Sequence, residues 1–282
     1  MKIAYIKLDK PTNENIISKI KYNVKNKMNK VWNDIDNKEI YYMCNAKEKS
    51  KKKIIKVLEN DKIDYALTEK IDLEYPKLEG RYLLKYMLPE VVEYCFKKIK
   101  LRNDEIYICT NKYNNENLTI IYEFINRVKV VNIVSNNENY RKLEEKLEEK
   151  GEYIAVLNNK RKTLKNANIV INLDFENLKE YNINRNMIII DLTNKFQIPT
   201  GFNGIYIRKI KIDTNKIMRI FSEFENFNRN ELLEAEMIKL EKFEDVREYI
   251  RNNRFYITEL YGKRKIDISE LAKIGRTEKK ND

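Results

Sequence analysis

"EIYICTNKYNNENLTIIYEFI", residues 105–125, has the pattern of a buried strand, a polar turn and the first turns of a helix. The same alternation continues toward the C-terminus. Short runs rich in Ile and Val predict strands, and the polar segments between them predict helices. Continuously apolar strands separated by helices are typical of a parallel sheet that is covered on both faces. The predicted strands span 105–110, 128–135, 152–158, 168–174 and 186–193, and the helices span 116–126, 138–150, 160–167 and 175–182.

The N-terminal third alternates in the same way, although its segments are less regular. Strands are predicted at 2–8, 39–45 and 63–68, and helices at 13–32 and 51–60. A long apolar helical segment follows at 78–101. It contains Pro89, so we expect a kink or break near Met87–Leu88.

The C-terminal third begins with an edge strand within 196–213 and then shows helical periodicity at 215–227 and 230–253. We therefore predict an α/β protein with a doubly wound, mostly parallel, Rossmann-like sheet, a smaller N-terminal α/β domain and C-terminal helices. The expected division is an N-terminal α/β domain at 1–77, a connector helix at 78–101, the Rossmann-like domain at 102–213, a C-terminal helical segment at 214–272 and a disordered tail at 273–282.

The composition excludes several kinds of catalytic site. The chain has no histidine, which rules out nucleophiles activated by a Ser-His or Cys-His pair. Its cysteines, Cys44, Cys95 and Cys109, lack the spacing of a zinc or redox motif, so we expect no metal site. No apolar run approaches 18 residues, and the first ten residues are too charged for a signal peptide. We therefore expect a cytoplasmic protein without a membrane partner.

A net charge of +12 leaves the nature of a macromolecular partner open. Such an excess can indicate nucleic-acid binding, and the stretches 203–212 and 252–265 mix aromatic and basic residues as single-strand binding surfaces do. The densest basic run, 47–56, equally fits the solvated face of an amphipathic helix. No nucleic-acid motif decides between the two.

Residues 128–174 resemble the second half of the NAD(P)-binding domain of the shikimate dehydrogenase and glutamyl-tRNA reductase group. "VKVVNIVSNNENYRKLEEKLEEKG" is similar to the second strand, turn and helix of that domain, and "LKNANIVINLD" is similar to its "ADIVIN" strand. The resemblance implies that Ser135, Asn136 and Asn137, with Arg141 nearby, would face the ribose or its 2′-phosphate, and that the cofactor would be NADP.

The departure from this group lies in the turn that would hold the pyrophosphate. A glycine-rich turn lets the backbone approach the pyrophosphate closely, but the span 104–198 contains a single glycine, Gly151. Asn111, Asn114 and Asn115 tolerate left-handed backbone conformations but do not supply the missing space. Thr110, Asn111 and Lys112 could instead hold one phosphate, or form an ordinary polar turn. We do not expect ordinary NAD(P) binding.

Candidates for catalysis are few. "EIYYMCNAKEK" resembles the strand that carries the nucleophilic cysteine of glutamyl-tRNA reductases, and the matching residue is Cys44. A buried cysteine at a strand end is the alternative. Asn172, Asp174, Asp191 and Thr193 end predicted strands, where ligands bind in open α/β sheets, although such residues also cap turns and helices.

Three functions follow from these patterns. The first is a non-catalytic binding or regulatory protein with a degenerate dinucleotide site and a protein partner or a second copy as its ligand. The second is an NADP-dependent oxidoreductase, in which Asp191 or lysines transfer protons. The third is a basic nucleic-acid-associated protein.

Overall fold

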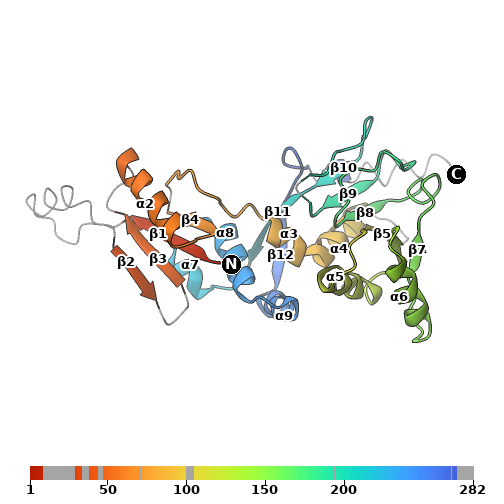
Figure 1. Cartoon of the computed structure of the whole chain (residues 1–282), viewed down its shortest axis with the longest axis horizontal. Helices are drawn as coiled ribbons and strands as arrows, with labels where there is room; N and C mark the ends of the chain where they lie inside the picture. Colours follow the sequence, from red (N-terminus) through yellow and green to blue (C-terminus); the bar gives the residue numbers. More distant parts are fainter. Residues whose placement is uncertain are drawn as a thin grey trace, which may run out of the picture. The chain divides into compact units, whose positions relative to one another are not determined.

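The computed structural model describes residues 1–8, 29–33, 38–43, 47–69, 71–99, 105–193, 195–267 and 269–271. The chain divides into two compact units (Figure 1): Met1–Gly80 with Thr214–Tyr249, and Arg81–Asp213 with Ile250–Asp282. The segment 214–272, which the sequence groups as one helical segment, is thus divided between both units. Cys44 and the predicted tail at 273–282 lie outside the described residues.

The second unit contains a six-stranded sheet in which all neighbouring strands are parallel. The strand order is β10-β9-β8-β5-β6-β7. Read along the chain from β5, this is the order 3-2-1-4-5-6 of the Rossmann fold. The predicted parallel α/β sheet is therefore confirmed. Its strands are β5 (Glu105–Cys109), β6 (Val130–Val134), β7 (Ala155–Leu157), β8 (Ile169–Asn172), β9 (Ile188–Asp191) and β10 (Ile205–Ile207).

Two helices connect the first three strands of this sheet, as predicted. Helix α5 (Asn115–Ile125) packs against β6, and α6 (Glu138–Glu148) packs against β7. Both place apolar residues on one side, so each buries a stripe against the strands.

The helices predicted at 160–167 and 175–182 are wrong. Residues 160–166 form consecutive turns, and 175–182 is irregular apart from a bridge at Asn177. Asparagine side chains explain the difference, because they bind nearby backbone groups and compete with helical hydrogen bonds. The Asn159 Oδ1 accepts from the amides of Arg161 and Lys162. These turns still cover one face of the sheet, packing Leu164, Ala167, Phe175 and Leu178 against Tyr107, Cys109, Val134, Val170 and Ile189.

The apolar segment at 78–101 forms two helices, α3 (Arg81–Tyr86) and α4 (Leu88–Ile99). They are separated at Met87, which confirms the predicted break. Pro89 lies in the first turn of α4, where its missing N–H removes no helical hydrogen bond.

The first unit contains a four-stranded sheet of order β2-β3-β1-β4. Its central strand β1 (Ile3–Leu8) is parallel to β3 (Lys38–Met43) and β4 (Tyr65–Thr68), while β2 (Asn29–Asn33) is antiparallel to β3. The helix predicted at 13–32 is wrong for residues 29–32, since pairing with β3 places them in a strand. Its other residues lie outside the described ones.

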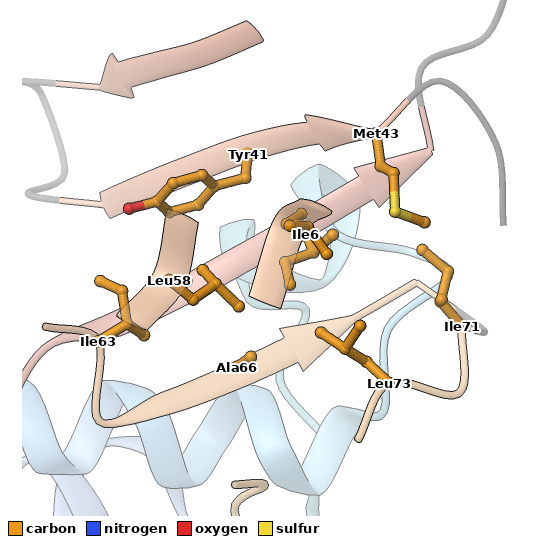
Figure 2. Close-up of a cluster of buried hydrophobic side chains, with 10 residues drawn as sticks. Ile6, Tyr41, Met43, Leu58, Ile63, Ala66, Ile71 and Leu73 are labelled. Atoms are coloured by element: carbon orange, nitrogen blue, oxygen red, sulfur yellow. The ribbon is translucent and has the colours of Figure 1, made fainter. Parts of the chain in front are cut away.

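Helix α2 (Glu48–Asn60) contributes buried side chains to the core of this sheet, which Figure 2 shows in close-up. Side chains from β1, β3, β4 and α2 meet in one layer with the chain that follows β4. Its labelled members are Ile6, Tyr41, Met43, Leu58, Ile63, Ala66, Ile71 and Leu73, all buried.

The C-terminal part is less helical than predicted. Helix α7 (Arg219–Glu223) covers only part of 215–227. The helix predicted at 230–253 is divided into α8 (Arg229–Lys239) and α9 (Phe243–Asn253), because Glu241 adopts a left-handed φ of 56°. Strand β10 is the edge strand expected within 196–213, and β11 (Lys209–Thr214) leaves that sheet to pair with β12 (Phe255–Tyr261).

Candidate functional site

The candidate site lies at the carboxyl ends of β5, β6 and β8. The strand order reverses between β5 and β8, and this is where open α/β sheets bind ligands. The turn from β5 into α5 occupies the position that holds the pyrophosphate in dinucleotide-binding proteins.

The carboxylate of Asp174 occupies the donors of this turn. It accepts hydrogen bonds from the backbone amide of Asn111 at 2.8 Å and from that of Lys112 at 3.0 Å. The Thr110 hydroxyl donates to the same carboxylate at 2.6 Å. Asp174 follows β8 and Thr110 follows β5, so an anionic side chain from one strand end is bound by the turn of its neighbour.

Two further side chains hold the turn in this conformation. The Asn117 amide nitrogen donates to the Thr110 hydroxyl oxygen at 2.8 Å and to the Lys112 carbonyl at 2.9 Å. It also lies 3.4 Å from the Asp174 carboxylate. The Tyr140 hydroxyl donates to the Lys112 carbonyl at 2.7 Å, and the ring of Tyr113 packs edge-on against the Tyr140 ring. Burial raises the pKa of the Tyr140 phenol, so it remains a donor at neutral pH.

The asparagines of the turn adopt no left-handed conformation. Within the fully described stretch 105–125, no residue has a positive φ. Asn114 has φ −145° and is the N-cap of α5, where its side chain accepts from the Asn117 amide at 2.9 Å.

Asn111 joins the turn to the end of β6. Its side-chain oxygen accepts from the Asn136 amide at 2.9 Å and lies 3.5 Å from the Ser135 hydroxyl. Its carbonyl accepts from the Asn137 side chain at 2.8 Å. Ser135 and Asn136, which the resemblance implies would face the ribose, therefore contact Asn111. Arg141 is half exposed, and its nearest ion-pair partner is Glu138 of the same helix, at 3.8 Å.

Asn172 and Asp191 form a second polar cluster at the ends of β8 and β9. Both are buried, and the Asn172 side chain donates to the Asp191 carboxylate at 2.8 Å and to the Phe175 carbonyl at 2.9 Å. The Tyr206 hydroxyl of β10 donates to the other Asp191 oxygen at 2.6 Å. Burial, together with this bond, raises the pKa of Tyr206 well above its usual range. The Thr193 amide completes the set by donating to Asp191 at 3.0 Å.

The described cysteines are poorly suited to nucleophilic chemistry. Cys95 and Cys109 are buried and free. Burial raises the pKa of Cys95 to about 12, and burial with the nearby Asp174 charge raises that of Cys109 further. A thiol that stays protonated is a weak nucleophile.

A cleft of about 360 Å³ opens beside Asp174. Its lining carries three carboxylates and includes neither lysine nor arginine, so it lacks the cations that usually bind phosphate groups. It is lined by Asn111, Asn136, Asp174, Phe175, Glu176, Asn177, Glu180 and Tyr181.

The structure brings together several residues that the sequence predicted for a ligand site, and they form hydrogen bonds with one another. These residues are Thr110, Asn111, Lys112, Asn136 and Asp174. Sequence reasoning missed the supporting side chains Asn117, Tyr140 and Tyr206. Asn117 could have been noticed three residues after the N-cap Asn114, while nothing in the sequence pattern marks the two tyrosines.

Neither a metal cluster nor a membrane span is found among the described residues. No group of three or more Cys, Asp or Glu side chains there is arranged to hold a metal ion. Helices in the same residues are all too short or too polar to cross a bilayer.

Comparisons with known proteins do not identify the chain. No protein-family model matches it, and no curated protein is significantly similar to it in sequence. The likeness to the shikimate dehydrogenase and glutamyl-tRNA reductase group therefore stays a prediction, carried by the residues quoted above.

Proposed function

We propose that the chain is a non-catalytic binding or regulatory protein built on a dinucleotide-binding fold whose nucleotide site is closed. The observation that carries the proposal is the Asp174 carboxylate, which accepts the two backbone amides that a pyrophosphate would need. A dinucleotide would have to displace a charged group that already has three donors at 2.6–3.0 Å.

The positions around the turn support the same proposal. The ribose-facing positions contact Asn111, and Asp191 is surrounded by Asn172, Tyr206 and the Thr193 amide. A general base needs a lone pair within reach of the substrate. Both Asp191 oxygens already accept hydrogen bonds and the residue is 2% exposed, so it is poorly placed for proton transfer.

The experiment is a thermal-shift titration with NAD, NADH, NADP and NADPH, and with ATP as the control for general anion effects. A ligand that binds only the native state raises stability by about 2.7 kcal/mol at a hundred times its Kd. In a folded unit of the size of Arg81–Asp213 with Ile250–Asp282, this stabilisation corresponds to a Tm increase on the order of 5–10 °C. We expect the Tm to stay flat at millimolar concentrations. A saturable rise specific to one nicotinamide cofactor would restore the oxidoreductase hypothesis.

A further inference from the structure

The hydrogen-bond donors around Asp174 are arranged as in an anion-binding turn, and the Asp174 carboxylate already occupies them. Two backbone amides and one hydroxyl converge on a single carboxylate, and the Asn117 side chain approaches it as a fourth donor at 3.4 Å. Successive backbone N–H groups that point toward one position are the arrangement that binds phosphate in other proteins.

The position of the turn in the fold is that of a phosphate site. It connects the first strand of a 3-2-1-4-5-6 sheet to the helix that follows, at the point where the strand order reverses. The anion found there, however, belongs to the chain itself and comes from a residue 64 positions from Thr110.

We infer that Asp174 determines the ligand specificity of this site, because its carboxylate takes the place of a phosphate group and excludes phosphate-bearing ligands from the turn. The inference deepens the proposed function and rests on it. It assigns the closure of the nucleotide site to one side chain rather than to the missing glycines alone.

Access to the turn supports this assignment. Asp174 is partly exposed and lines the 360 Å³ cleft together with Asn111 and Asn136. A small anion in the cleft would therefore reach the donors directly once the carboxylate is removed. The wild-type carboxylate excludes it in two ways, by occupying the donors and by repelling a second negative charge.

The test uses the full chain and inorganic phosphate as the probe. Asp174→Ala removes the carboxylate and leaves the amides of Asn111 and Lys112 without their acceptor. We expect this variant to bind phosphate saturably in the millimolar range, measured by calorimetry and by the Tm at constant ionic strength. Wild type should show only the gradual, unsaturable stabilisation that phosphate gives to most proteins.

Glu176→Ala is the matched control. Glu176 lines the same cleft and is exposed, so its removal lowers the negative charge by the same amount without freeing any donor of the turn. If Glu176→Ala gains phosphate binding equal to that of Asp174→Ala, charge alone is responsible and the inference is wrong. It is equally wrong if neither variant gains binding.

A second variant covers the case in which Asp174→Ala does not fold. Asp174→Asn keeps the size of the side chain, but its amide nitrogen cannot accept, so one backbone donor becomes free. It should bind phosphate more weakly than Asp174→Ala and more strongly than wild type. Adding Thr110→Val should weaken the gained binding at least tenfold, because it removes the hydroxyl donor.

The two proposals fail on different results. Nicotinamide cofactor binding by the wild-type protein would overturn the proposed function. Absence of phosphate binding in both Asp174 variants, with a wild-type protein that ignores nucleotides, would overturn only the role of Asp174.

Discussion

The Thr110 hydroxyl donates a 2.6 Å hydrogen bond to the Asp174 carboxylate, and this bond joins the carboxyl ends of β5 and β8. Thr110 is fully buried, and its oxygen also accepts from the Asn117 side chain. The hydroxyl therefore acts as donor and acceptor at the centre of the cluster, and its loss would affect both neighbours.

Thr110→Val should destabilise the protein by about 1–3 kcal/mol, because valine keeps the shape but removes a charge-assisted bond to Asp174 and one acceptor of the Asn117 side chain. Chemical unfolding measured by circular dichroism tests this. Thr110→Ser retains the hydroxyl and is the control. A valine variant no less stable than the serine variant would show that the bond contributes little.

Asn114→Ala should cost about 1 kcal/mol, since Asn114 is the N-cap of α5 and its side chain accepts from the Asn117 amide at 2.9 Å. Asn115, the next residue, is exposed and begins the helix, so Asn115→Ala provides the matched control. The free energy of unfolding should fall for the first variant and change by less than about 0.5 kcal/mol for the second. Equal losses would contradict the capping role.

The strands of the six-stranded sheet could be predicted because their signal is local. Each is a short, mostly apolar run, and the run at 105–109 is buried almost throughout, as its composition implies. The break at Met87 was predictable for the same reason, since Pro89 restricts the backbone next to it.

The contact between Asp174 and the turn after β5 could not be predicted from the sequence. Asp174 contacts Asn111 across 63 residues, and nothing local distinguishes a carboxylate that binds a neighbouring turn from one that faces a ligand. The missing glycines indicated only that the turn lacks the space for a close backbone approach to a pyrophosphate. Gly204 serves a different close contact, because a β-carbon there would lie 2.0 Å from the Met187 carbonyl oxygen, just before β10.

The wrong helices share one physical cause. Segments 160–167 and 175–182 contain helix-compatible residues, but neighbouring asparagine side chains satisfy the backbone locally, as Asn177 does for the Lys179 amide. The strand at 29–33 was missed for a different reason, because its pairing with β3 is a tertiary contact that overrides a helical pattern.

Cys95 and Cys109 should not react with a thiol reagent in the native protein, because both are fully buried and burial raises the pKa of each thiol. A Cys44→Ser variant isolates these two residues. It should show no rapid reaction with Ellman's reagent under native conditions and two reactive thiols in denaturant. Rapid native labelling would mean that the structure opens around helix α4 for Cys95, or around β5 for Cys109.

The ion pairs around Glu259 should make the free energy of unfolding decrease at acid pH. The Glu259 carboxylate accepts from the Lys211 ammonium at 2.7 Å and also contacts Lys265 and the Tyr261 hydroxyl. The bonds from Lys211, Lys265 and Tyr261 lower the pKa of Glu259 from 4.5 to about 2. A carboxylate whose pKa is lower in the folded state contributes stability above its unfolded pKa, and this contribution is lost as protons bind.

The contribution of Glu259 should therefore be complete above about pH 5 and should decline as the pH falls from 4.5 toward 2. Glu259→Gln removes the charge and keeps the size of the side chain. At neutral pH the variant should be less stable than wild type, and the gap between their free energies of unfolding should narrow over that window. The measurement is urea unfolding at several pH values.

Glu244→Gln is the control, because Glu244 is an exposed glutamate in the first turn of α9. A gap between wild type and Glu259→Gln that stays constant from pH 6 to pH 3 would show that the ion pairs do not act through the ionisation of Glu259.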